Sequence, residues 1–199
     1  MSATTHAGAA ATTRHFINTG EYDRATLERI VERAIANKGV HSSALAGTSI
    51  ALLFFNSSLR TRASFEVGIA QLGGHATTLE VGAGVWNLEI SDGAVMDADK
   101  PEHIRDAAAV LSRYFDAIAV RSFPKLKSLA DDLEDPVLEA LRAHATVPVI
   151  NGLTNDSHPC QLMADVMTFE EHKGPIAGKT IAWVGDGNNV ARSFLQAAA

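Results

Sequence analysis

Residues Thr48–Arg62 read TSIALLFFNSSLRTR and set the fold class. Thr48–Phe55 is a continuous apolar run of strand length, which is typical of a parallel strand covered on both faces. A polar turn at 56–61 follows it. Arg62–Leu72 then has the pattern of a helix that stops at a Gly-Gly pair. We therefore predict a buried strand, a polar turn and a helix in succession.

The alternation of strands and helices continues on both sides of this stretch. The further predicted strands are His75–Val81, Ala117–Phe123, Val147–Asn151 and Thr180–Asp186. One further helix is predicted after Asp23, and another has Pro101 in its first turn. Lys125–Ala143 is predicted to be mostly helical, with a break near Asp135-Pro136. The last two predicted helices are His158–His172 and one that begins at Val190. This order indicates an α/β fold with a parallel sheet flanked by helices. Ligands of such sheets bind at the carboxyl ends of the strands.

Composition narrows the class of protein. A hydrophobic fraction of 46% is enough for a buried core, and a net charge of -6 argues against broad nucleic-acid binding. No apolar run approaches the ~20 residues of a membrane helix. The single cysteine, Cys160, cannot form an internal disulfide, which indicates a protein of a reducing compartment. We expect residues 1–14 to be a disordered lead-in without a secretory signal.

The turn after Phe55 is a candidate anion site. Free backbone N–H groups at a helix start attract anions, and Ser58 and Thr61 add hydroxyl donors. Arg60 and Arg62 add planar guanidinium groups suited to phosphate. A capped turn with two solvated arginines is an equally good interpretation of the composition alone.

Two other predicted strand ends also carry polar side chains. Arg121 stands near the end of its strand as an anion clamp or a surface charge, and the basic first loop favours the clamp. His158 and Gln161 share one face of a helix's first turn, where both can donate to a carbonyl. Taken alone, a capping histidine and an exposed glutamine explain them as well. Cys160 has no neighbour that would activate it as a nucleophile.

Two weaker patterns complete the candidates. The turn from Gly185 to Asn189 resembles a dinucleotide fingerprint, but Val190 stands where the third glycine belongs. Asp99, Glu102 and His103 match no familiar metal-ligand spacing and are expected to line a helix start. We predict neither a metal site nor a cofactor.

Together these motifs resemble the aspartate/ornithine carbamoyltransferase family. Residues 55–62, FNSSLRTR, are similar to its carbamoyl-phosphate signature, and residues 158–161, HPCQ, to its His-Pro-x-Gln motif. Arg121 falls where the family keeps a third carbamoyl-phosphate arginine. Residues 151–154 and 185–190 resemble the ornithine branch. The resemblance runs from about His15 to the last residue.

The resemblance implies a role for each residue. Ser58, Leu59, Arg60 and Thr61 would hold the phosphate. Arg60, Arg121 and His158 would polarise the carbamoyl carbonyl, Gln161 would bind its amino group, and Asn189 would contact ornithine. The implied reaction moves the carbamoyl group of carbamoyl phosphate to the δ-amine of L-ornithine. It gives L-citrulline and phosphate, as in arginine biosynthesis, without a covalent enzyme intermediate.

One segment departs from the ornithine branch. The loop at 82–103, with Gly84-Val85-Trp86 and residues 95–99, is more similar to enzymes that act on N-acetylornithine or N-succinylornithine. In that branch the tryptophan reaches a neighbouring subunit's carbamoyl-phosphate site. Trp86 is therefore either a substrate-binding residue or an aromatic anchor of its own loop.

The length also departs from the family, whose members are roughly half as long again. We expect a fragment with three parts: the lead-in at 1–14, a carbamoyl-phosphate domain at 15–150, and at 151–199 a linker helix with the start of a second, Rossmann-like domain. The implied assembly is a cytoplasmic homotrimer with shared active sites. The alternatives are an N-acylornithine acceptor, a non-catalytic anion-binding or assembly module, and, from the Gly185 turn alone, a nucleotide-dependent oxidoreductase.

Overall fold

The computed structural model describes residues 14–82, 86–97, 99–123 and 134–198. Its main sheet has four parallel strands in the order β2-β1-β5-β6. Their bounds are β1 Ser49–Phe54, β2 His75–Glu80, β5 Ala117–Arg121 and β6 Val149–Leu153. The predicted parallel sheet is thus confirmed, with β6 lying two residues later in the chain than expected.

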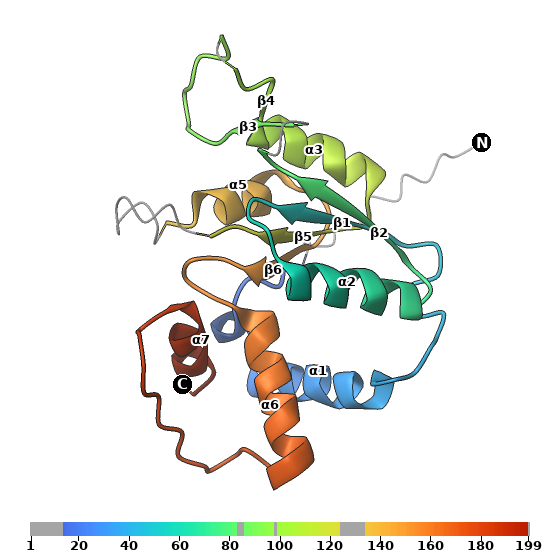
Figure 1. Cartoon of the computed structure of the whole chain (residues 1–199), viewed down its shortest axis with the longest axis vertical. Coiled ribbons are helices and arrows are strands. Elements are labelled where there is room, and N and C mark those ends of the chain that lie inside the picture. The colour runs from blue at the N-terminus through green and yellow to red at the C-terminus, as the bar shows by residue number, and fades with distance from the viewer. Residues whose placement is uncertain (1–13, 83–85, 98, 124–133, 199) are drawn as a thin grey trace, which may run out of the picture.

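Helices cover both faces of this sheet (Figure 1). On one face lie α3 (Ile104–Tyr114) and α5 (Pro136–His144), and on the other lies α2 (Leu59–Gln71). Each face has its own hydrophobic cluster. Alternate residues of β1 enter each cluster, Leu53 on the α3–α5 side and Leu52 on the α2 side. Both leucines are fully buried, which explains why the strand is apolar without interruption.

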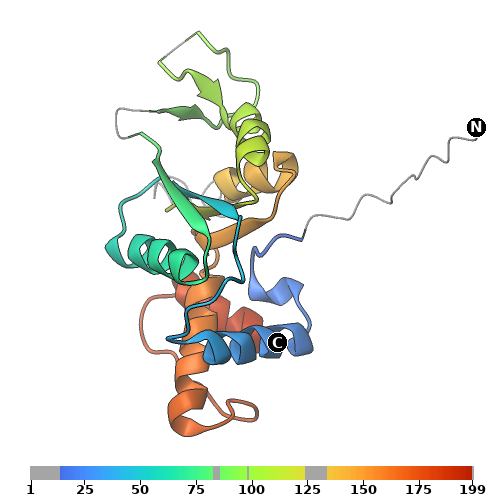
Figure 2. The same cartoon turned by 90° about the vertical axis from the view of Figure 1, so that its right-hand side faces the viewer.

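Three more helices gather at one end of the molecule. They are α1 (Arg24–Asn37), α6 (Pro159–Lys173) and α7 (Asn189–Ala198). The short 3-10 helix η1 (Thr19–Glu21) lies with them. A two-stranded pair, β3 (Leu88–Glu89) and β4 (Glu102–His103), projects at the opposite end, as Figure 2 shows. None of the helices in the described ranges is both long and apolar enough to cross a membrane.

Several predicted boundaries are confirmed by specific capping contacts. The Asp23 carboxylate accepts a hydrogen bond from Thr26 N at 2.7 Å and caps α1. The predicted break at Asp135-Pro136 is the start of α5, where Asp135 adopts a left-handed backbone with φ 43°. The part of the predicted helix at 125–133 lies outside the described residues, as do residues 1–13 of the expected lead-in.

Other predictions were wrong. Helix α2 begins at Leu59 rather than Arg62, because Ser58 caps it and brings residues 59–61 into its first turn. Pro101 precedes β4 instead of opening a helix, and His103 caps α3. The expected domain boundary after residue 150, which falls inside β6, is a separate case and stays a prediction.

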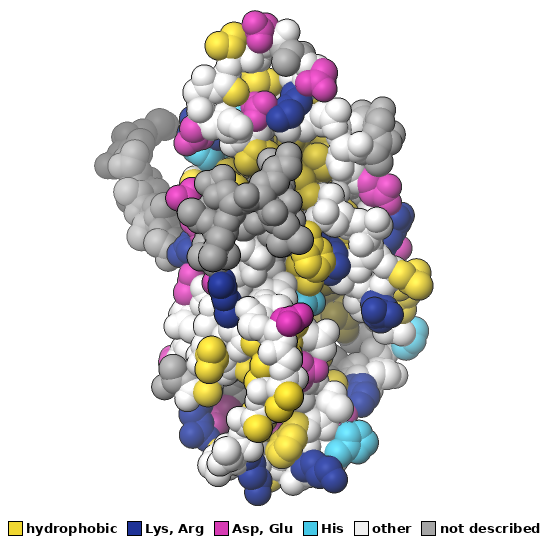
Figure 3. Space-filling model, turned by 60° about the vertical axis from the view of Figure 1, so that its left-hand side comes forward, with side chains coloured by type: hydrophobic (Ala, Val, Ile, Leu, Met, Phe, Trp, Pro, Cys, Tyr) yellow, Lys and Arg dark blue, Asp and Glu magenta, His cyan; other side chains and the backbone are white. Residues whose placement is uncertain are grey.

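The predicted fifth strand at 180–186 is also wrong. These residues pair with no strand in the described part of the chain, and Val184 is 95% exposed. Ile181 and Trp183 are exposed too, and Figure 3 shows hydrophobic patches low on the face where this connection runs. An apolar strand pattern needs a hydrogen-bonded neighbour to become a strand, and none of the described residues supplies one.

Candidate functional site

The first part of the site is the turn from β1 into α2. Ser58 is the N-cap of α2, and its hydroxyl accepts a hydrogen bond from Thr61 N at 3.3 Å. The first turn of a helix has N–H groups without intrahelical partners, and the helix dipole makes that end positive. Residues 58–61 therefore stand together at a helix start, which is where anions bind. Leu59 is 82% exposed there, so only its backbone can take part.

The two arginines of this turn differ in their partners. Arg62 contacts the Glu66 carboxylate at 3.1 Å and the Glu80 carboxylate at 2.6 Å. These ion pairs compete with the predicted role of Arg62 as a phosphate fork, which stays a prediction. Arg60 is exposed, and no carboxylate of the described residues pairs with it. Arg60 is thus the arginine of this turn that is available to an anion.

Arg121 reaches the same turn from the end of β5. Its Nη1 donates to Thr61 Oγ1 at 3.1 Å, which joins the β5 edge to the first turn of α2. Its Nε is buried without a hydrogen-bond partner among the described residues. Burial lowers the pKa of the Arg121 guanidinium from its ordinary value, although an arginine remains charged at neutral pH. A partly buried cation with which no carboxylate of the described ranges pairs favours binding of an anion.

A β-bulge gives Arg121 this position. The pairing of β5 with β6 shifts register between Val120 and Arg121, so that Arg121 lies opposite Leu153. Bulges re-aim the side chain that follows them. The strands approach so closely that a Cβ on Gly152 would lie 3.0 Å from the Val120 carbonyl oxygen. Gly152 is therefore the residue that permits the bulge.

His158 follows β6 and caps α6. Its Nδ1 accepts a hydrogen bond from Gln161 N at 3.4 Å, so a neutral ring carries its proton on Nε2 and can donate from there. Burial, with a smaller contribution from the positive charge of Arg121, lowers the pKa of His158 to about 4. His158 is therefore neutral at physiological pH and can donate a hydrogen bond to a carbonyl oxygen.

Gln161 and Cys160 stand beside His158 on the first turn of α6. Gln161 is exposed, and its amide nitrogen donates to Asp165 at 2.8 Å, which leaves its carbonyl oxygen for a donor such as a carbamoyl amino group. Cys160 Sγ lies 3.5 Å from the Asn151 carbonyl oxygen. Burial raises the pKa of the Cys160 thiol to about 12, which agrees with the prediction that it is no nucleophile.

Asn189 lies at the start of α7. Its Nδ2 donates to the Thr154 carbonyl oxygen at 2.7 Å, which ties α7 to the loop after β6. Its Oδ1 has no partner among the described residues and can accept a hydrogen bond from an amino group. Asp135 had not been recognised from the sequence. Its carboxylate accepts from the Thr154 hydroxyl and, at 3.2 Å, from Asn155 N, and so fixes the same loop.

Trp86 is anchored within its own chain. Its Nε1 donates to Glu102 Oε2 at 2.9 Å, and its ring packs against the α3–α5 core cluster. The neighbouring residues 83–85, with the predicted Gly84-Val85, lie outside the described part. His103 accepts from Arg105 N through Nδ1, so Glu102 and His103 both have local structural partners.

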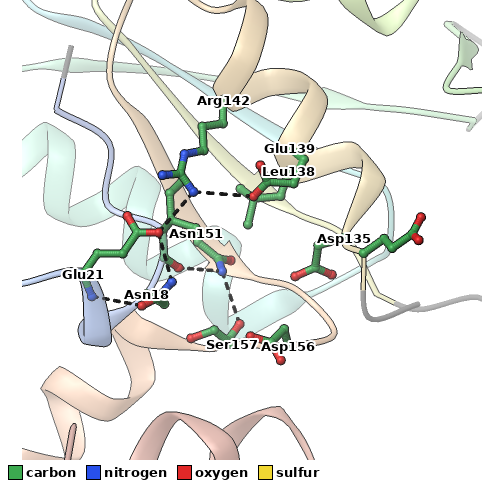
Figure 4. A pocket seen from close by; sticks show the side chains of 11 residues that line it. Asn18, Glu21, Asp135, Leu138, Glu139, Arg142, Asn151, Asp156 and Ser157 are labelled. Atoms are coloured by element: carbon green, nitrogen blue, oxygen red, sulfur yellow. Dashed lines mark hydrogen bonds and ion pairs between the residues drawn. The ribbon is translucent and has the colours of Figure 1, made fainter. Parts of the chain in front are cut away.

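A separate pocket of about 110 Å³ lies between η1, α5 and the end of β6. Five carboxylate residues line it, and Figure 4 shows Arg142 between Glu21 and Glu139, with which it forms ion pairs at 3.1 and 3.7 Å. The fully buried Asn151 also lines it and donates to the Ser157 carbonyl oxygen. An acidic lining disfavours anions, so the candidate anion site is the one formed by Thr61, Arg60 and Arg121.

Curated relatives match nearly the whole chain. It is 46% identical to the ornithine carbamoyltransferase of Rhizobium johnstonii over 191 residues, which cover 94% of this chain and 56% of that protein. It is 44% identical to the ornithine carbamoyltransferase of Agrobacterium fabrum, covering 95% of this chain and 56% of that protein. The chain thus spans little more than half the length of these relatives.

Solved structures give a second comparison. An acetylornithine transcarbamylase complexed with acetylcitrulline has a TM-score of 0.84 and 44% identity, covering 93% of this chain and 58% of that one. An N-acetyl-L-ornithine transcarbamylase mutant complexed with carbamyl phosphate and N-succinyl-L-norvaline has a TM-score of 0.78 and 47% identity, covering 81% and 49%. The family model for the aspartate/ornithine carbamoyltransferase carbamoyl-P binding domain matches residues 14–171. The chain therefore belongs to the aspartate/ornithine carbamoyltransferase family.

Proposed function

We propose that the protein containing this chain transfers the carbamoyl group of carbamoyl phosphate to the δ-amine of L-ornithine, giving L-citrulline and phosphate. The observation that carries the proposal is the pair of arginines, Arg60 and Arg121, on either side of Thr61, with which no carboxylate of the described residues pairs. Carbamoyl phosphate joins a phosphate, which suits this cationic turn, to a neutral carbonyl, which suits the Nε2–H of His158. A related structure contains carbamyl phosphate.

The chemistry needs positioned donors rather than a nucleophile on the protein. The amine nitrogen attacks the carbonyl carbon, the bond from that carbon to the phosphate oxygen breaks, and the proton lost by the amine passes to the departing phosphate. Ser58, Leu59, Arg60 and Thr61 would hold the phosphate as it leaves. Arg60, Arg121 and His158 would stabilise the charge on the carbonyl oxygen, and Gln161 would bind the amino group. The high pKa of the Cys160 thiol fits a route without a cysteine intermediate.

We predict that Arg60→Ala abolishes binding of carbamoyl phosphate and that Arg62→Ala does not. The two arginines lie in the same turn and each carries one positive charge, but Arg62 is paired with Glu66 and Glu80. Isothermal titration of each variant gives the binding heat, with inorganic phosphate as a chemically stable second probe. Wild-type heats in Arg60→Ala would remove the central claim.

The acceptor is a second part of the proposal. Asn189 Oδ1 can accept from a free α-ammonium, and curated relatives are named ornithine carbamoyltransferase, which supports L-ornithine. The alternative acceptors are N-acetylornithine and N-succinylornithine, supported by the resemblance of the 82–103 loop and by the names of the structural relatives. Assays of the protein expressed from its complete gene with the three acceptors decide. Activity on an acylated form alone would reject L-ornithine.

Assembly and cellular setting complete the proposal. The family resemblance implies a cytoplasmic homotrimer in arginine biosynthesis, with Trp86 serving a neighbouring subunit's carbamoyl-phosphate site. Its Glu102 hydrogen bond instead favours the alternative role as an anchor of its own loop. Light scattering gives the number of subunits. Mixing a Trp86 variant with an Arg60 variant tests sharing, because shared sites would restore activity in the mixed assembly.

A further inference from the structure

Ser193 is a buried polar residue in the middle of α7. It has no exposed surface, and its hydroxyl donates to the Asn189 carbonyl oxygen one turn earlier at 2.8 Å. The same oxygen accepts the backbone N–H of His158 at 2.8 Å. A hydroxyl has one donor and two acceptor positions, so both bonds form together. Ser193 thus contacts the backbone of both His158 and Asn189.

Neighbouring contacts hold α7 on the loop that leads to His158. Asn189 donates to the Thr154 carbonyl oxygen at 2.7 Å, and Arg192 pairs with Asp156 at 2.9 Å. These two contacts involve partly exposed side chains, whereas Ser193 is fully enclosed. A buried N–H cannot exchange its partner for water without a structural change. Of these three contacts, the one made by Ser193 is therefore the one shielded from water, and it bonds the His158 backbone directly.

We propose that Ser193 is a positioning residue that sets the distance and orientation between His158, on the carbamoyl side, and Asn189, on the amino-acid side. The inference rests on the proposed function, because only a reaction between two bound substrates makes this spacing matter. Without the Ser193 oxygen, the His158 N–H has no acceptor and the turn shifts. Misplacement by about 1 Å can lower the rate of a positioned reaction about 100-fold.

The test uses Ser193→Ala in the protein expressed from its complete gene. Ser112→Ala is a matched control, because Ser112 in α3 donates to the Ala108 carbonyl oxygen at 2.7 Å and accepts Thr146 N at 3.0 Å. Both variants lose a bond to the carbonyl oxygen one turn earlier and an accepted backbone N–H, and Ser193→Ala also loses the 3.3 Å contact with Ser157 Oγ. Ser112 contacts none of the proposed site residues. We expect Ser193→Ala to lower kcat by about 10-fold to 100-fold. We expect Ser112→Ala to leave kcat at the wild-type value.

Two further measurements separate positioning from folding and from the proposed function. An NMR titration of the His158 ring should move from a midpoint of about 4 toward 6.5 in Ser193→Ala, because a displaced ring is less buried. Ser193→Cys keeps the branching of the side chain but replaces the oxygen with a larger sulfur that accepts only weakly, and should show the same loss of kcat. A wild-type protein that neither binds nor transfers a carbamoyl group would reject the proposed function, while the ring titration still tests the Ser193 contact.

Three results would overturn the inference. The first is an unchanged kcat and an unchanged His158 titration in Ser193→Ala. The second is an equal loss of kcat in Ser193→Ala and Ser112→Ala, which would indicate general destabilisation. The third is unfolding of both Ser193 variants while Ser112→Ala folds, because Ser193 would then support the fold rather than the spacing.

Discussion

Replacing Arg121 with methionine should weaken anion binding far more than it changes the stability of the ligand-free protein. The substitution removes a buried Nε that has no partner in the part of the chain that the structure describes, and whose burial costs about 1–3 kcal/mol. It also removes the hydrogen bond to Thr61 Oγ1, which contributes about 1.5 kcal/mol, and the contact of the guanidinium with the Phe123 ring at 5.1 Å, which contributes about 0.5 kcal/mol. Methionine keeps most of the apolar stem. The gain and the losses cancel to within about 1 kcal/mol.

Binding has no such compensation. A hydrogen bond between charged groups contributes about 1.5–3 kcal/mol, so the dissociation constant of carbamoyl phosphate should rise about 10-fold to 150-fold. At a ligand concentration about 100 times the wild-type dissociation constant, the ligand stabilises the wild type by about 2.7 kcal/mol. The same concentration should stabilise Arg121→Met by only about 0.3–1.4 kcal/mol.

Urea unfolding with and without ligand measures both quantities in one assay. Arg142→Met is the control, because that arginine is paired with Glu21 and Glu139 away from the anion site. It should lose about 1 kcal/mol or less of stability and keep the full stabilisation by ligand. Equal stabilisation of Arg121→Met and the wild type by ligand would show that Arg121 does not bind the anion. A loss of more than about 3 kcal/mol in the ligand-free variant would show that Arg121 is structural.

Two further predictions concern the surroundings of Arg121. Gly152→Ala should destabilise the protein by about 1–3 kcal/mol and weaken carbamoyl phosphate binding, because the added methyl group meets the Val120 carbonyl oxygen and disturbs the bulge. Urea unfolding measures the change in stability, and calorimetry measures the change in binding. Unchanged binding would show that the bulge does not position the anion site. For His158, the folded-state pKa of about 4 lies below the ordinary value of 6.5, so between these pH values the unfolded chain binds a proton that the folded chain does not. The stability contributed by the neutral ring is therefore complete above pH 6.5 and is lost as the pH falls toward 4. His158→Asn, which still suits an N-cap, should flatten this part of the curve of unfolding free energy against pH, and an equally steep curve in the variant would assign the pH dependence to other groups.

Local patterns predicted much of the fold from sequence. A few adjacent residues are enough to predict each of three features, and the structure confirms all three: the apolar run of β1, the Asp23 cap of α1 and the helix start at His158. The predicted start of α2 is three residues late because Ser58 and Thr61 have the composition of a turn, whereas a capping serine adds the residues after it to the helix. The segment at 180–186 failed for the opposite reason. Its pattern is right for a strand, but a strand depends on a partner that no local pattern supplies.

The candidate site shows the same division between local and distant information. The FNSSLRTR turn and the HPCQ segment could be found from sequence because each is contiguous. The contact of Arg121 with Thr61 spans 60 positions in the chain, and its geometry depends on a bulge permitted by Gly152. Ser193 gave no signal, because a serine inside a helix is ordinary until its hydroxyl is seen to be buried against another element.

The distinction between Arg60 and Arg62 illustrates what the structure adds to a motif. In the sequence, the two arginines are equivalent candidates, because both lie in the same short turn, Arg60 after the apolar Leu59 and Arg62 after the hydroxyl residue Thr61. In the fold, Arg62 lies on the side of α2 that faces β2, where Glu66 and Glu80 neutralise it, and Arg60 has no such acid within the described residues. An anion gains little from a guanidinium that already has two carboxylate partners, because binding would displace those pairs. In this turn, anion binding is therefore assigned to Arg60, the arginine with which no acid of the described residues pairs.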